Sequence, residues 1–317
     1  MRKFLSGVPI PMAGVALGFT VLGNLLNDYS TYLRTACGCI AGAIIILVLM
    51  KFIFCFKQVR EDFKNPIIVS VSATIYMAFM QLAVYLNGLT FIPNIYMISK
   101  TLWFIGVIMH CIVIVYFTYK LIAELKLHHV YPTYFVTYVG IVVASVTAPT
   151  FGEQQLGNYI FWFGLCAYIA VFLLVSYRYL RHEVEEASKP LFAIYTAPMS
   201  LSIVGYLTIS SNPDPMFMLT MEVLAQILYI VVLFQIPKII KLPFYPSYAA
   251  LTFPMCITPF ALLKTISFFE QNFSANVSGI VALIYVMELT IAILIVGYVF
   301  NHYLKFLFNN FKKSMKK

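Results

Sequence analysis

The chain has 317 residues, of which 62% are hydrophobic and only 10% charged, and its mean hydropathy is +0.89. A soluble domain needs about 25% charged residues, so the composition excludes a soluble globular protein and predicts an all-α, multi-pass membrane protein. The net charge of +9 does not indicate nucleic-acid binding, because no basic stripe is interleaved with stacking aromatic residues.

Stretches of about 20 mainly apolar residues, the length that crosses a bilayer, occur ten times. Residues 1–23 also resemble a signal peptide, but Pro9, Pro11 and Gly14 favour a retained span. Only residues 151–156 separate the fifth span from the sixth. We expect a single transmembrane domain over residues 1–317 and no soluble domain. The predicted spans are 8–27, 35–56, 66–88, 95–119, 131–150, 157–178, 190–211, 216–236, 246–266 and 277–303.

Lysine and arginine are distributed unevenly between the two sides of these spans. With the N-terminus inside, 18 of them fall on the cytosolic side. Only Arg34, Lys100 and Lys264 fall outside. Cytoplasmic loops carry such an excess, so the pattern predicts an even number of spans, a plasma (inner) membrane location and two cytoplasmic termini. Lys51 and Lys100 are close enough to span ends to extend to the interface.

Prolines mark the odd-numbered spans. The cytosolic starts of these spans carry a proline at spacings of 57, 66, 58 and 56 residues, namely Pro9, Pro66, Pro132, Pro190 and Pro246. This recurrence predicts five helical hairpins. The alternative is that junctions between loops and helices favour proline in general, because the first helical turn tolerates it.

The odd spans also differ from the even spans in their interiors. The odd spans carry further prolines inside or near their ends, whereas the even spans have none in their interiors. These further prolines are Pro11, Pro149, Pro198, Pro254 and Pro259. A proline frees a backbone carbonyl, which membranes tolerate only against protein or a water-filled cavity. The odd spans lack charged residues before Lys264 but contain hydroxyls. We therefore expect them to form an inner ring around a pore. Alternatively, the hydroxyls pack helices or bond to their own backbone.

Two acidic residues lie in the middle of even spans. Glu222 and Glu288 are candidates for proton coupling, because an ionisable group at this depth is often functional; the alternative is a role in helix packing or subunit contact. His110 is expected to be a hydrogen-bonded packing residue.

The six cysteines lie in apolar runs and form no metal-binding pattern. We expect no cofactor or metal. The inner spans lack the titratable groups of an intramembrane enzyme or sensor, so we expect no enzymatic activity.

Several short motifs resemble the tellurite-resistance/dicarboxylate transporter family, the TehA and slow-anion-channel type. The segment from Tyr248 to Met255, with its Thr-Phe-Pro sequence, is similar to a segment of that family. So are Gly14–Gly18, Asn65-Pro66, Thr196–Pro198 and Val139–Ser145. The chain departs from the family pattern at Ala16, Tyr76 and Thr137, where family members often have proline. We therefore expect three straighter inner helices.

The resemblance implies ten helices in five hairpins with quasi-fivefold symmetry, a central pore in each protomer and a homotrimer. It also implies that Phe253 plugs the pore. Phe253 lies seven residues after Pro246, about 10 Å into its helix. The other candidate pore-lining or kink residues are Gly14, Gly18, Thr74, Thr137, Pro198, Thr252 and Pro254.

We interpret the sequence as a channel-like transporter of small inorganic or organic anions, with membrane lipid as its surroundings and an aromatic gate in the ninth helix. The alternative is a proton-coupled carrier for C4-dicarboxylates, tellurite or sulfite that uses Glu288 or Glu222. A pore without charged selectors does not identify its substrate.

Overall fold

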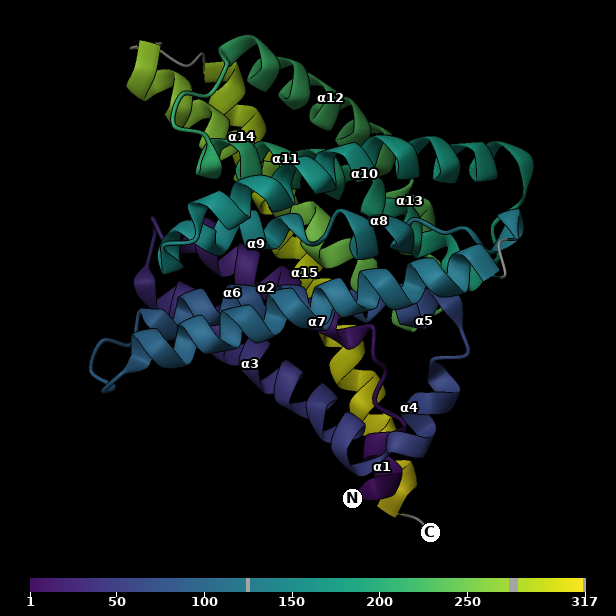
Figure 1. Ribbon diagram of the computed structural model, residues 1–317. Coiled ribbons are helices and arrows are strands. Elements are labelled where there is room, and N and C mark those ends of the chain that lie inside the picture. The colour runs from purple at the N-terminus through teal and green to yellow at the C-terminus, as the bar shows by residue number, and fades with distance from the viewer. Residues whose placement is uncertain (124–125, 274–278, 316–317) are drawn as a thin grey trace.

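In an apolar environment each backbone N–H and C=O must be paired within the chain, and a helix achieves this within one segment. The computed structural model describes residues 1–123, 126–273 and 279–315, and over these residues it contains helices and no strands (Figure 1). The start of the tenth predicted span, residues 277–278, lies outside the described residues, as do Lys316 and Lys317. The elements are α1 (Arg2–Ser6), α2 (Met12–Leu26), α3 (Thr31–Phe54), α4 (Phe56–Asp62), α5 (Pro66–Val71), α6 (Ala73–Asn87), α7 (Ile95–Ala123), η1 (Leu127–His129), α8 (Thr133–Tyr138), α9 (Val142–Thr147), η2 (Ala148–Phe151), α10 (Gln154–Arg181), η3 (Glu186–Thr196), α11 (Ala197–Ile209), α12 (Pro215–Leu233), α13 (Ile236–Ile239), η4 (Pro246–Leu251), α14 (Thr252–Phe273) and α15 (Gly279–Met315).

Eight helical segments of the described chain are long and apolar enough to cross a membrane. This confirms the all-α membrane class. The first and fifth predicted spans correspond to shorter apolar helices, Met12–Leu26 and Val142–Phe151, so the count of ten stays a prediction.

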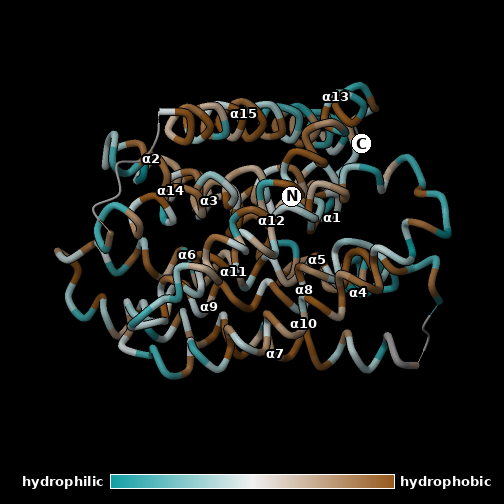
Figure 2. The backbone as a smooth tube through the Cα atoms, turned by 90° about the horizontal axis from the view of Figure 1, so that it is seen from above, coloured by the Kyte–Doolittle hydropathy of each residue, from teal (hydrophilic) through white to brown (hydrophobic). Residues whose placement is uncertain are grey.

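Burial alternates along the chain. In the most apolar windows of the third, seventh and ninth spans, 67%, 78% and 72% of residues are buried. The corresponding shares for the five even spans are 39%, 28%, 33%, 33% and 22%. Figure 2 shows α7 and α15 at opposite edges of the bundle, with α5, α8 and α11 between them. This arrangement agrees with an inner ring of odd spans and an outer ring of even spans.

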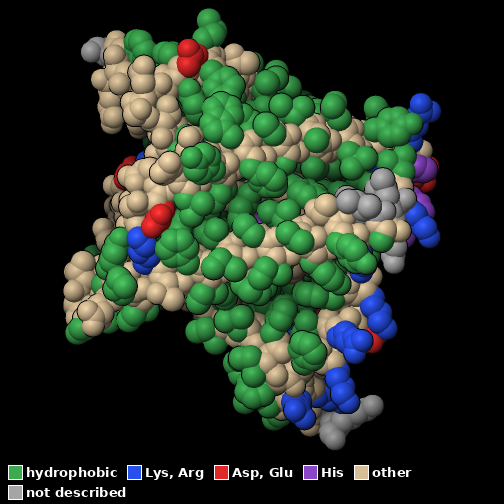
Figure 3. All heavy atoms as spheres, viewed as in Figure 1, with side chains coloured by type: hydrophobic (Ala, Val, Ile, Leu, Met, Phe, Trp, Pro, Cys, Tyr) green, Lys and Arg blue, Asp and Glu red, His purple; other side chains and the backbone are tan. Residues whose placement is uncertain are grey.

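The surface follows from this arrangement. Hydrophobic side chains cover most of the face shown in Figure 3, as expected for helices in contact with lipid. Most of the lysine and arginine side chains visible there gather along the right and lower edges, toward the end of the molecule where the two termini lie in Figure 1.

The inner segments have an irregular backbone. The seventh and ninth spans begin as the 3-10 segments η3 and η4 before continuing as α11 and α14. The third span is divided into α5 and α6, and the fifth into α8, α9 and η2. The even spans contain single long α-helices. Irregular backbone at membrane depth is tolerated where protein surrounds it, and here it lies in the buried ring.

The third span is interrupted at Ser72 and the fifth between α8 and α9, both without a proline at the break, whereas the change from α9 to η2 falls at Pro149. The expectation of straighter inner helices stays a prediction. In the third, the hydroxyls of Ser72 and Thr74 donate to carbonyls three residues earlier, at 2.7 Å each, a contact that bends helices. In the fifth, Nε2 of His110 donates to the carbonyl of Thr137 at 2.9 Å. That carbonyl is therefore withdrawn from the helical hydrogen-bond pattern. The first inner helix, α2, is continuous.

A tight turn separates the fifth and sixth spans. Gly152 adopts the left-handed conformation, with φ of 73°, immediately after η2, and a residue without Cβ does so without strain. Lys100 donates to the carbonyl of Phe151 at 2.9 Å and forms an ion pair with Glu153 at 2.8 Å. The turn is thereby fixed to α7.

The two ends of the chain pack against each other. Nδ2 of Asn310, near the end of α15, donates to the carbonyl of Phe4 at 3.0 Å. The rings of Phe4 and Phe311 meet edge to face, with centroids 5.7 Å apart. Because α14 also packs against α2, the first and last hairpins are neighbours and the ring of helices closes.

Candidate functional site

A cavity of about 470 Å³ lies inside the inner ring. All five odd-numbered spans contribute to its wall, through residues between the predicted cytosolic start and about the middle of each span, including Leu17, Thr74, Phe135, Leu191 and Phe253. The chain folds this way because each odd span starts at the same end of the bundle, so five successive starts surround one space. The cavity is thus the common product of the five hairpins.

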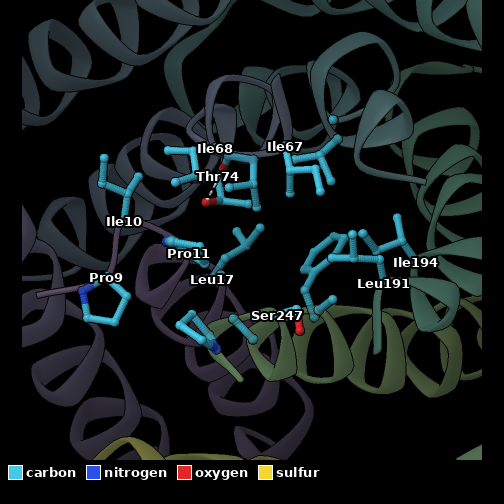
Figure 4. Close-up of a pocket in the computed structure, with 18 of the residues that line it drawn as sticks. Pro9, Ile10, Pro11, Leu17, Ile67, Ile68, Thr74, Leu191, Ile194 and Ser247 are labelled. Atoms are coloured by element: carbon cyan, nitrogen blue, oxygen red, sulfur yellow. Dashed lines mark hydrogen bonds between the residues drawn. The ribbon is translucent and has the colours of Figure 1, made fainter. Parts of the chain in front are cut away.

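The wall of the cavity is mainly apolar. Figure 4 shows Leu17, Ile67, Ile68, Leu191 and Ile194 around a shared space. Such a wall binds an ion weakly and therefore does not retain it, which is a condition for conduction.

Two hydroxyls are labelled in the same wall, those of Thr74 and Ser247. Thr74 donates to the carbonyl of Val71 at 2.7 Å, and Ser247 donates to the carbonyl of Ala187 at 2.5 Å. Their hydrogen atoms are therefore used within the protein. Many other hydroxyls of the inner spans bond to their own backbone, as the alternative interpretation of the sequence held: those of Ser70, Ser72, Thr147, Ser200, Ser202 and Thr258.

Three charged residues occur in the described cavity wall, all at one end: Lys51, Asp62 and Glu185. Lys51 is only 3% exposed. Its Nζ lies 2.6 Å from Oδ2 of Asp62 and donates to the carbonyl of Val8 at 2.7 Å. The sequence suggested a lysine extended to the interface. The sequence shows that Lys51 lies at the end of a span. It does not show the pairing with Asp62 on α4, because that pairing depends on how the two helices meet in the fold.

Phe253 lies in the first turn of α14, lines the cavity with Pro254, and is 7% exposed. The preceding η4 advances about 2.0 Å per residue rather than 1.5 Å. Phe253 is therefore about 13 Å along the axis from Pro246, deeper than the sequence estimate. Since Pro254 has no backbone N–H, the first turn of α14 lacks one donor.

Of the other residues predicted for the pore, Gly14, Thr74 and Pro198 also line the cavity. Gly18, Thr137 and Thr252 lie behind its wall. Thr252 donates to the carbonyls of Gly14 and Ala249 at 2.9 and 2.8 Å. Thr137 donates to the carbonyl of Ser70 at 3.1 Å. These residues hold inner helices together.

Gly18 permits the close approach of α2 to α14. A Cβ at this position would lie 2.6 Å from Cβ of Thr252 and 3.1 Å from its backbone carbonyl carbon. Only a residue without a side chain fits there. Gly18 thus fixes the element that carries Phe253.

The two acidic candidates lie away from the cavity wall. Glu222, on α12, accepts hydrogen bonds from Gln226 at 3.0 Å and from Thr265 at 2.9 Å. Glu288, on α15, is 3% exposed, and its Oε2 has no hydrogen-bond partner among the described residues. A buried oxygen without a partner is costly. Glu222 lies where the outer helix α12 meets the inner helix α14, and Glu288 is buried on the outer helix α15.

A bundle of membrane-spanning helices around an apolar cavity fits a transport protein of the channel or carrier class. Residues 7–300 match the SLAC1 family model, described as voltage-dependent anion channels. The chain belongs to this family, which confirms the resemblance seen in the sequence and makes anion transport its general function. A search of curated proteins found no match.

Proposed function

We propose that this protein conducts small anions passively through the cavity of each protomer, with the Phe253 side chain as the gate. The observation that carries the proposal is the convergence of all five odd spans on one apolar cavity that reaches Phe253 and Pro254. An apolar ring in a narrow passage excludes water, and an ion cannot pass where its lost hydration is not replaced.

The proposed setting is the plasma (inner) membrane, with both termini and the charged end of the cavity on the cytoplasmic side. The excess of lysine and arginine at that end supports this orientation. We also propose a homotrimer in which each protomer has its own pathway. The exposed apolar outer helices leave surface for both lipid and neighbouring protomers.

The test is anion flux through purified protein in liposomes. Chloride, nitrate, sulfite and malate should each be tried under an imposed membrane potential, with empty liposomes as the control. The proposal expects saturable or channel-like flux of at least one small anion. A protein that is folded and oriented but carries none of them would refute it.

The second candidate is a proton-coupled carrier for C4-dicarboxylates, tellurite or sulfite. The observation in its favour is the buried, unpartnered carboxylate oxygen of Glu288, together with the buried Glu222. The reversal potential under an imposed pH gradient separates the candidates. Passive conduction follows the gradient of the anion alone. A shift that tracks the proton gradient and disappears in Glu288→Gln or Glu222→Gln would favour the carrier.

A further inference from the structure

Lys51 is the only basic residue in the described cavity wall. It lies near the end of α3, yet its ammonium group is directed inward, to the Val8 carbonyl and the Asp62 carboxylate. A buried ammonium group is costly unless it is paired. Asp62 thus allows a positively charged side chain to be kept at the mouth of a mainly apolar pathway, whose described wall also contains Glu185 at this end.

The Asp62 carboxylate is held as a bound oxyanion would be. One oxygen lies 2.6 Å from Nζ of Lys51, and the other accepts from Nε2 of Gln58 at 2.9 Å. One cationic donor and one neutral donor therefore hold a planar carboxylate. Asp62 is 19% exposed, so solution reaches this end of the cavity.

We propose that Lys51 is an anion-binding residue at the cavity mouth, and that Asp62 occupies its site as a built-in competitor. The ligands are small monovalent planar oxyanions, namely nitrate and simple carboxylates, because they replace a carboxylate. An incoming anion replaces Asp62 as the partner of the Lys51 ammonium group, and Asp62 pairs with Lys51 again when the anion leaves. The competition keeps binding weak, as conduction requires. The assignment rests on the proposed function in taking this cavity as the pathway.

The chain provides a matched control. Lys100 also contacts one backbone carbonyl, that of Phe151 at 2.9 Å, and one carboxylate, that of Glu153 at 2.8 Å. Neither member of this second pair lines the cavity. Neutralising Glu153 therefore tests whether any freed lysine of this type captures anions.

The experiment measures equilibrium nitrate binding to purified, detergent-solubilised full-length protein at constant ionic strength. The variants are Asp62→Asn, Glu153→Gln, and the double variant Lys51→Gln with Asp62→Asn. We expect Asp62→Asn to lower the nitrate Kd at least about tenfold. We expect Glu153→Gln to leave it unchanged. The double variant should bind nitrate more weakly than the wild type.

Three results would overturn the assignment: an unchanged Kd in folded Asp62→Asn, an equal gain in Glu153→Gln, or a gain that survives loss of Lys51. If Asp62→Asn does not fold, the double variant decides by comparison with the wild type, and undiminished binding would refute the proposal. Because binding is measured without flux, a protein that binds nitrate at Lys51 but conducts no anion would refute the proposed function alone.

Discussion

Removal of the Phe253 ring is the most direct test of the gate. In the wild type this side chain is 7% exposed, lines the cavity and lies about 13 Å along the axis from Pro246, near the middle of a core about 30 Å thick. Phe253→Ala shortens the side chain to Cβ, so water and anions meet a wider passage from which a large apolar ring has been removed. Pro254 is retained, so the substitution does not alter the backbone donor pattern of the first turn of α14.

The expected increase in anion flux is at least about tenfold, equivalent to lowering the barrier by about 1.4 kcal/mol. Phe253→Leu should give a smaller increase, since it keeps an apolar side chain of intermediate size. Phe268→Ala is the matched control. Phe268 lies in the same helix and is 9% exposed, but it does not line the cavity.

Flux per protein should be measured in liposomes containing equal amounts of monodisperse wild type and variants, or by single-channel recording. The gate assignment fails if folded Phe253→Ala shows unchanged or lower flux. It also fails if Phe268→Ala increases flux to the same extent, because loosening of the bundle would then explain both results.

Two further predictions concern topology and helix contact. Reporter fusions should place both termini in the cytoplasm, together with the loops after Phe56, Tyr119, Arg178 and Pro237. If any one of these loops is found outside, the five-hairpin scheme is contradicted. Gly18→Val should lower the free energy of unfolding by about 1–3 kcal/mol in thermal unfolding, because its Cβ would lie 2.6 Å from that of Thr252. The control is Gly42→Val, which should change stability far less because no neighbouring atom lies within 4 Å of a Cβ at that position. Equal effects of the two substitutions would refute the packing argument.

The alternation of inner and outer helices could be predicted from sequence because it depends on composition. Lipid-facing helices cannot expose freed backbone groups, so prolines such as Pro198 and Pro254 occur in the buried spans. The Lys51–Asp62 pair could not be predicted in this way. The two residues are 11 positions apart and lie on separate helices, α3 and α4. Their meeting depends on the angle between those helices.

The interruption of the fifth span illustrates a second limit of sequence patterns, and it can be tested. His110 lies on α7 and is fully buried, and its Nε2 donates to the carbonyl of Thr137 on α8. No local signal near Thr137 indicates this donor. His110→Phe keeps a ring but leaves the carbonyl unpaired, so it should lower the free energy of unfolding by about 1–3 kcal/mol. His110→Gln retains an N–H donor and should restore part of this loss. Thermal unfolding in detergent measures both variants, and equal stability of wild type and His110→Phe would refute the stabilising role assigned to this hydrogen bond.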